Sequence, residues 1–112
     1  MTDARMPTGL WVQAHLARLS SKGIPVVLVK RGDLNSGIVM VKVNRIEGGI
    51  DIFMQGRDAA GNFSWQPGID GRRVDDLEAD AFIKRQTAYD PDIWVIEIED
   101  CEGCNPIEIL DM

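Results

Sequence analysis

The stretch from Gly23 to Arg57 decides the fold of this chain, and it reads GIPVVLVKRGDLNSGIVMVKVNRIEGGIDIFMQGR. Three runs rich in β-branched residues are separated by two groups of turn-forming residues, at positions 32–37 and 48–49. β-Branched residues are enriched in strands, whereas glycine with asparagine or aspartate marks the turns between them. The stretch therefore predicts three consecutive strands of an antiparallel sheet.

The segments on either side of this stretch complete the predicted order of elements. Apolar residues at a helical spacing predict a helix over residues 8–22, with Thr8 as its N-cap and Gly23 just beyond its end. A second predicted helix, over residues 75–88, has aspartates in its first turns and basic residues near its end, the order that the helix dipole favours. The predicted strands cover residues 26–29, 38–46, a run that begins at Ile50, 63–66 and 93–99.

This order predicts an α+β fold, in which an antiparallel sheet of four to five strands packs with two helices, most simply on one face. The last strand is expected to join the sheet at an edge or beside the first strand. A chain of 112 residues is expected to form a single domain. Within it we expect a frayed N-terminus over residues 1–7, a core over 8–99 and an acidic tail over 100–112.

The charge balance limits the partners that the chain is expected to bind. The net charge is −6, divided into +3 over residues 1–56 and −9 over residues 57–112. An acidic protein is poorly suited to contact nucleic-acid phosphates, so nucleic acid is not an expected partner. The sequence has no apolar run of the ~20 residues that span a bilayer and no secretory signal pattern at its start. We therefore expect a cytoplasmic protein that does not enter the membrane.

The second and third predicted strands have apolar residues on both faces. Valines at 39, 41 and 43 point to one side, and two helices are not expected to cover both sides of the sheet. The apolar residues expected on the uncovered face are Ile38, Met40 and Phe53. Exposed apolar patches of this kind mark interfaces, so the pattern predicts a homodimer or another protein partner.

Two groups of residues are candidates for a binding site. Arg31 and Asp33 lie in the turn between the first two predicted strands. Arg57, Arg72 and Arg73 lie near Trp65 in sequence, and arginine beside an exposed aromatic ring is a common anchor for an anion, a nucleotide or a protein. The alternative is that Trp65 belongs to the core and that the arginines pair with nearby aspartates.

Cys101 and Cys104 form a Cys-x-x-Cys motif in the acidic tail. A zinc site needs four ligands, and the one other soft ligand in the sequence is His15, which lies on the apolar stripe of the first helix and is expected to be packed there. Neighbouring carboxylates would also raise the thiol pKa, which disfavours a redox pair. We therefore expect no metal and no cofactor. The sequence contains none of the common phosphate-binding or catalytic motifs.

Taken together, three segments resemble a known family. They are Leu10-Trp11-Val12, Lys30-Arg31-Gly32-Asp33 with Gly37, and Tyr89-Asp90-Pro91-Asp92-Ile93-Trp94-Val95. The chain resembles the domain-of-unknown-function family numbered 1491, short proteins of alphaproteobacteria, over most of residues 8–99. The resemblance implies no activity and no catalytic residues. Our first hypothesis is a non-catalytic binding or adaptor module, and the alternative is a small-molecule or nucleotide binder, enzymatic or not, that uses the arginines and Trp65.

Overall fold

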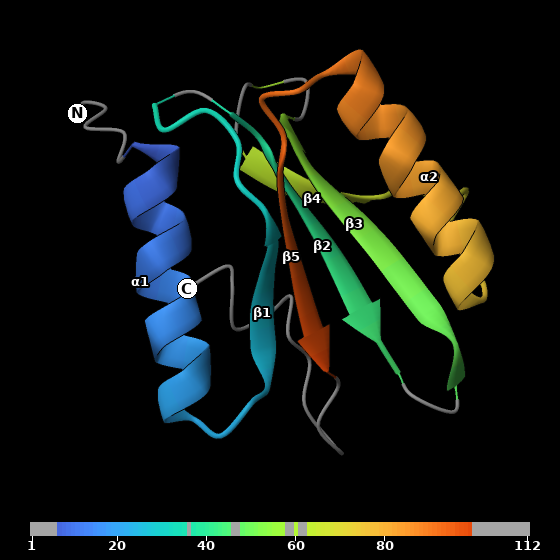
Figure 1. Ribbon diagram of the computed structural model, residues 1–112, viewed down its shortest axis with the longest axis horizontal. Coiled ribbons are helices and arrows are strands. Elements are labelled where there is room, and N and C mark those ends of the chain that lie inside the picture. Colours follow the sequence, from blue (N-terminus) through green and yellow to red (C-terminus); the bar gives the residue numbers. More distant parts are fainter. Residues whose placement is uncertain (1–6, 36, 46–47, 58–59, 61–62, 100–112) are drawn as a thin grey trace.

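The computed structural model describes residues 7–35, 37–45, 48–57, 60 and 63–99. The elements, in chain order, are α1 (Thr8–Ser21), β1 (Val26–Lys30), β2 (Val39–Asn44), β3 (Ile50–Arg57), β4 (Phe63–Pro67), α2 (Asp76–Tyr89) and β5 (Trp94–Glu99) (Figure 1). The predicted α+β class and the predicted order of elements are confirmed.

The five strands form one sheet in the order β1-β5-β2-β3-β4. Strand β5 pairs antiparallel with β1 and parallel with β2, so the sheet is mixed rather than wholly antiparallel. The predicted pairing of the first two strands is wrong, because β5 lies between them. The reason is that β5 buries Trp94, Ile96 and Ile98 on the α1 face and Val95 on the α2 face, so it is better placed inside the sheet than at its edge. Its position beside the first strand is one of the two that we predicted.

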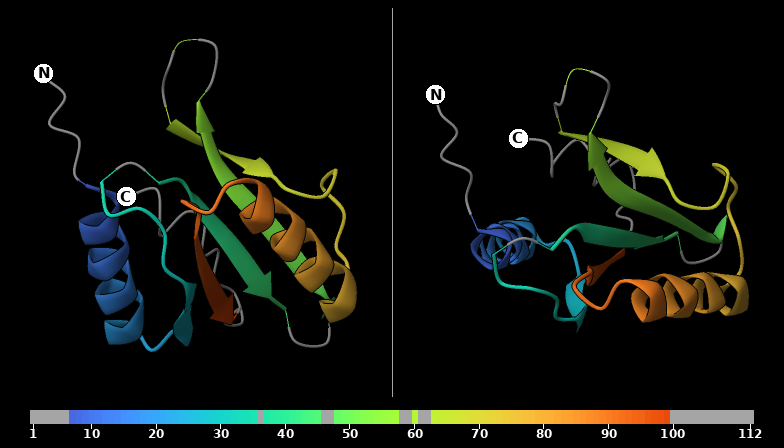
Figure 2. Two further views of the ribbon diagram at one scale, coloured as in Figure 1. Left: turned by 45° about the horizontal axis from the view of Figure 1, so that its top comes forward. Right: turned by 90° about the horizontal axis from the view of Figure 1, so that it is seen from above.

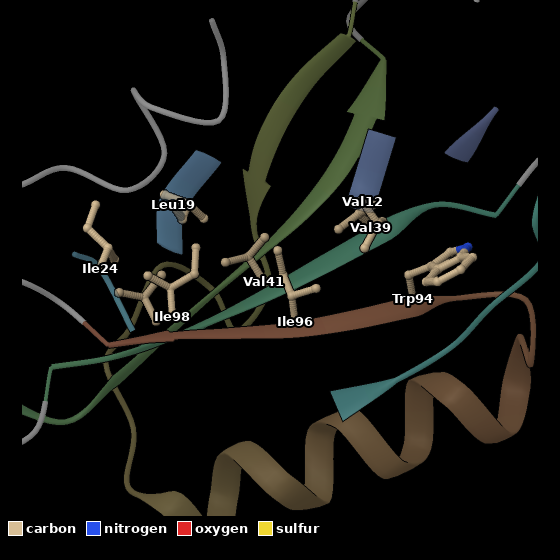
Figure 3. Close-up of a cluster of buried hydrophobic side chains, with 9 residues drawn as sticks. Val12, Leu19, Ile24, Val39, Val41, Trp94, Ile96 and Ile98 are labelled. Carbon is tan, nitrogen blue, oxygen red and sulfur yellow. The ribbon is translucent and has the colours of Figure 1, made fainter. Parts of the chain in front are cut away.

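The two helices cover opposite faces of the sheet (Figure 2). Figure 3 shows the α1 face, where Val12 and Leu19 of the helix meet a row of side chains from the strands. The buried residues of this face are Val12, Leu19, Ile24, Val39, Val41, Val43, Trp94, Ile96 and Ile98. On the other face α2 and the segment before it cover Met40, Ile50, Ile52, Val74, Ala79, Ile93 and Val95. The expectation that both helices pack on one face is wrong, because the central strands are apolar on both faces and need cover on both.

The apolar face expected at the surface is covered within the chain. Met40 is 0% exposed beneath α2, and Ile38 is half-buried against the same cluster. Phe53 lies on the opposite face, because the register pairs it with Val41, and there it packs against the α1 cluster. The reasoning that placed these three residues on one exposed face was therefore wrong.

Strand β1 lies at the edge of the sheet and has one open face. Although residues 26–29 are all valine or leucine, Val27 and Val29 are 60% and 50% exposed. Val26 and Leu28 face α1 and are half-buried. The opposite face of β1 remains open because α2 packs against the other strands.

The helix ends follow local rules with one exception. The first helix ends as predicted, with Gly23 at a φ of 78° and a hydrogen bond from the amide of Ile24 to the carbonyl oxygen of Leu19. The side chain of Asp75 caps α2 by accepting a hydrogen bond from the amide of Glu78 at 2.8 Å. Thr8, predicted as the cap of α1, instead uses its hydroxyl to bind the loop before β2. No helix in the described part of the chain is long and apolar enough to cross a membrane.

Candidate binding surface

The loop after β1 and the turn before β5 are hydrogen-bonded to each other. The amide of Asp33 donates to the carbonyl oxygen of Asp92 at 3.0 Å, and the indole N–H of Trp94 donates to the carbonyl oxygen of Asp33 at 2.7 Å. Trp94 is 2% exposed. Two of the three segments that the family resemblance rests on therefore meet in one place, although about sixty residues separate them in the chain.

Two glycines allow these segments to approach each other. A Cβ atom on either Gly32 or Gly37 would overlap the carbonyl oxygen of Asp92, and on Gly32 it would also lie 2.7 Å from the Trp94 ring. Heavy atoms cannot pack at such separations, so the backbone must move for any larger residue. The two glycines are thus required by the close contact of backbone with backbone.

Lys30 holds the turn from the other side. Its ammonium group donates to the carbonyl oxygens of Pro91 at 2.7 Å, Arg31 at 3.0 Å and Ile93 at 3.2 Å. The carboxylate of Asp90 accepts a hydrogen bond from the amide of Asp92 at 3.1 Å, which closes the turn. Because its ammonium group binds three carbonyl oxygens, Lys30 helps to fix the hydrogen-bonded unit formed by the loop after β1 and the turn before β5, which we call the frame.

The first two residues of α1, which immediately precede the third segment of the resemblance, are hydrogen-bonded to the loop after β1. The hydroxyl of Thr8 donates to the carbonyl oxygen of Gly37 at 2.8 Å, and the amide of Gly9 donates to the carbonyl oxygen of Leu34 at 2.9 Å. Gly9 leaves room for the Leu34 side chain, which would lie 2.9 Å from a Cβ at this position. These contacts hold the first turn of α1 and the loop after β1 together as one surface.

A shallow open pocket of about 280 Å³ lies on that surface. It is lined by Pro7, Gly9, Leu10, Gln13, Leu34 and Asn35, all of which are uncharged. Leu10 and Leu34 are 56% and 55% exposed. An apolar depression of this kind can accept an apolar side chain, and the described residues that line it include no acid, base or nucleophile for catalysis.

Arg31 and Asp33, predicted as binding residues, lie in the loop after β1, whose Leu34 and Asn35 line this pocket. The guanidinium carbon of Arg31 is 5.7 Å from the centre of the Trp94 ring, within the range of a cation–π contact. The carboxylate of Asp33 accepts a hydrogen bond from the amide of Asn35 at 3.1 Å. The backbone of both residues is held by the frame described above.

The structure does not gather the predicted arginine–tryptophan group into one site. Arg72 pairs with Glu78 at 2.9 Å, whereas Arg73 pairs with Asp51 at 3.1 Å. Trp65 is half-buried in the α1 face, 6.1 Å from the ring of Trp11 and opposite Gln55 in the sheet. The side chain of Arg57 lies outside the described part of the chain, as do Cys101 and Cys104.

Asp51 is held between two arginines. Arg45 contacts the same carboxylate at 3.0 Å, and the side chains of Arg45 and Asp51 are only 18% and 15% exposed. The predicted pairing of arginines with acidic residues therefore occurs, but with Asp51 and Glu78 rather than the aspartates next to them in sequence. Asp51 lies four residues from Gln55 along β3, or about 13 Å at the usual rise per residue, which separates this ion-pair group from Trp65.

His15 is packed in α1, in agreement with its predicted position. Its ring stacks on Trp11 with 3.9 Å between centroids, and its Nδ1 lies 2.8 Å from the carbonyl oxygen of Trp11. Its Nε2 is buried and has no hydrogen-bond partner among the residues that the structure describes. The described residues also contain no group of three or more metal-ligand side chains.

Lys42 is a buried charged residue that the sequence reasoning missed. It is 7% exposed, and its ammonium group lies 3.2 Å from Asp76, 3.2 Å from Asp80 and 3.6 Å from Glu97. Burial lowers the pKa of Lys42, but hydrogen bonds to the two aspartates and the charge of Glu97 outweigh it, so the net pKa is raised. A lysine with a raised pKa stays charged at neutral pH and is not a nucleophile. The sequence signal for this ion-pair group was the pair Asp76 and Asp80, four residues apart on a helix, together with Lys42 within an otherwise apolar strand.

The comparisons with known proteins identify the family but assign no activity. The family model described as "Protein of unknown function (DUF1491)" matches residues 6–108, and no curated protein matches the chain. The crystal structure of a DUF1491 family protein from Caulobacter crescentus CB15 is 34% identical, with a TM-score of 0.77, over 86% of this chain and 89% of that one. The NMR structure of a DUF1491 family protein from the same organism is 33% identical, with a TM-score of 0.77, over 91% and 92%. The solution structure of protein Atu0922 from A. tumefaciens shares the fold at 20% identity, with a TM-score of 0.74 over 92% of each chain. The chain therefore belongs to the DUF1491 family.

Proposed function

We propose that this chain is a non-catalytic, cytoplasmic protein-binding module whose contact surface is the apolar rim formed by Leu10 and Leu34. The observation that supports this function is the shape and chemistry of the site: an open, uncharged depression with two leucines more than half exposed on its rim. Small-molecule sites are typically concave and bury most of the ligand, whereas exposed apolar patches are typical of protein interfaces.

The frame beneath this surface supports the same function. Hydrogen bonds from Gly9 and Thr8 join the start of α1 to the loop after β1, so both leucines are presented in a fixed relation. A preformed surface loses less conformational entropy when a partner binds. We infer that the partner places an apolar side chain between Leu10 and Leu34, with Gln13 and Asn35 available for polar contacts at the margin.

Substitution of the two leucines tests this function. Leu10→Asp and Leu34→Asp should abolish capture of a specific partner from native lysate and weaken its measured affinity by about tenfold or more each, since central apolar contacts dominate interfaces. Leu10 lies in the first turn of α1, where an aspartate is compatible with the helix dipole, so the fold should be retained. Leu77→Asp is the matched control, because Leu77 is 82% exposed on α2.

The same variants test the predicted self-association. Light scattering over a dilution series gives the mass of the wild-type chain and of Leu10→Asp. A dimer that is lost in Leu10→Asp but kept in Leu77→Asp would identify the partner as a second copy of this chain. Equal capture of all partners by wild type and both rim variants would contradict the proposed surface.

A further inference from the structure

We propose that β1 is a second docking site, at which an extended segment of another protein with alternating apolar and basic residues adds as a further strand. Strand β1 is the first strand in the sheet order, and among the described residues its one strand partner is β5. This site is separate from the Leu10–Leu34 rim, and the inference does not depend on the function proposed for that rim.

The free backbone groups of β1 can be assigned from its pairing with β5. The amide of Glu99 donates to the carbonyl oxygen of Pro25 at 3.0 Å, so the backbone of Pro25 faces β5. Backbone groups alternate in direction along an antiparallel strand, so those of Val27 also face β5 while those of Val26 and Leu28 point to the open edge. The edge thus presents two N–H donors and two C=O acceptors, the groups that strand addition uses.

The first part of this edge is not protected against pairing by a charged side chain among the described residues. Edge strands are commonly protected by a charged side chain, most often lysine. The lysine of β1 does not serve this purpose, because the ammonium group of Lys30 is bound by the carbonyls of Pro91 and Ile93. Val27 is instead 60% exposed on the face that α2 leaves open. An irregularity in the register between Leu28 and Lys30 limits regular docking to the first part of the strand.

The charges beside the edge select the partner. Val27 lies opposite Glu97, and on the same face Glu97 adjoins the carboxylates around Lys42. The nearest acidic residues are Glu97 and Glu99 on β5, and Asp76 and Asp80 lie further in, around Lys42 of β2. The basic residues on this side are Lys42, Lys30 of β1 and, one turn beyond Asp80 on α2, the exposed Lys84. The excess of negative charge favours a basic partner and opposes a second copy of this chain, which has the same acidic groups.

A designed peptide tests the inference on the full chain. The probe is a fluorescein-labelled octapeptide of alternating lysine and valine, acetylated and amidated at its ends. We expect it to bind and to shift the NMR amide signals of Val26 and Leu28 most. The same peptide with glutamate in place of lysine should bind about tenfold more weakly or worse. A version with alternate backbone nitrogens methylated should lose a similar factor, because it keeps the side chains but cannot form the strand hydrogen bonds.

Two matched variants separate this site from the leucine rim. Val27→Lys should abolish binding of the lysine–valine peptide, since it restores a protecting charge at the edge. Leu10→Lys introduces the same charge at a residue of similar exposure, 56% against 60%, and should leave peptide binding unchanged. Equal binding of the methylated peptide, signal shifts centred on Leu10 and Leu34, or a wild-type dimer lost in Val27→Lys would each overturn the inference.

Discussion

The indole nitrogen of Trp94 donates a hydrogen bond to the backbone carbonyl oxygen of Asp33 across 2.7 Å, from within the core. This bond joins the strand β5 to the loop after β1 and fixes the position of that loop. We predict that Trp94→Phe, which keeps most of the apolar volume, lowers the free energy of unfolding by about 1–3 kcal/mol through the lost hydrogen bond. Trp94→Ala should cost about 3–5 kcal/mol.

Urea unfolding followed by far-ultraviolet circular dichroism measures both changes without relying on tryptophan fluorescence. If Trp94→Phe unfolds at the same urea concentration as the wild type, the hydrogen bond to Asp33 does not contribute to stability.

The close contact at Asp92 gives a second prediction. Gly32→Ala or Gly37→Ala forces a Cβ atom against the carbonyl oxygen of Asp92, so each should lower the free energy of unfolding by about 2 kcal/mol or more. Gly48→Ala is the control, because Gly48 is exposed and its nearest neighbours are the side chains of Arg45 and Arg73. Thermal melts of the three variants compare them, and a Gly37→Ala variant as stable as Gly48→Ala would contradict the contact.

Lys42 predicts a dependence of stability on alkaline pH. Its pKa in the folded chain is raised above the ordinary value of 10.5, so its carboxylate contacts stabilise the fold fully below that pH. The contribution is lost as the pH rises through the folded-state pKa, where the ammonium group loses its proton. Lys42→Met removes the charge and should cost about 1–3 kcal/mol at neutral pH, less than a fully buried pair because the aspartates are exposed.

The measurement is the difference in unfolding free energy between wild type and Lys42→Met as a function of pH. It should remain constant from neutral pH to about pH 10 and then shrink. If the difference in unfolding free energy instead shrinks as the pH is lowered, at pH values where the carboxylates are still ionised, the charge of the Lys42 ammonium group is not the stabilising element.

Asp51 predicts unequal effects for its two arginines. Asp51→Asn removes both ion pairs and should cost about 1–2 kcal/mol, because the carboxylate is mostly buried. Arg73→Met should cost less than about 1 kcal/mol, since Arg73 is 54% exposed and solvent screens its charge. A double-mutant cycle of Arg45 and Asp51 at low and high salt measures the buried pair. A coupling energy of zero would contradict its structural role.

The local features of this fold were predictable from the sequence because they depend on neighbouring residues. Helical spacing of apolar residues located α1, and the order of acidic and basic residues located α2. The end of α1 at Gly23 followed from the backbone freedom of glycine. The resemblance to the DUF1491 family was also correct, because it rested on short motifs in the sequence itself.

The residues that line the pocket were not predictable from the sequence. Arg31 and Asp33 stay predictions from the turn in which they lie, and Leu10 and Leu34 were not singled out, because single exposed leucines have no distinctive pattern in a sequence. Arg72 and Arg73 were grouped with Trp65 because they are near it in the chain. The sheet instead places Trp65 opposite Gln55 and leaves Arg73 with Asp51, several residues away along β3.

By itself, the sequence determined the helices and strands, their order, and the alternation of apolar residues along β2 and β5, because each of these depends on spacing within one segment. Only the tertiary structure decided that β5 lies between β1 and β2 and that the helices cover opposite faces. The physical reason is that an apolar strand can satisfy its burial in several positions, and the choice between them depends on how all the other elements are covered. The same choice left β1 at the edge, with Val27 open to solvent, and brought the carbonyl of Asp33 to Trp94.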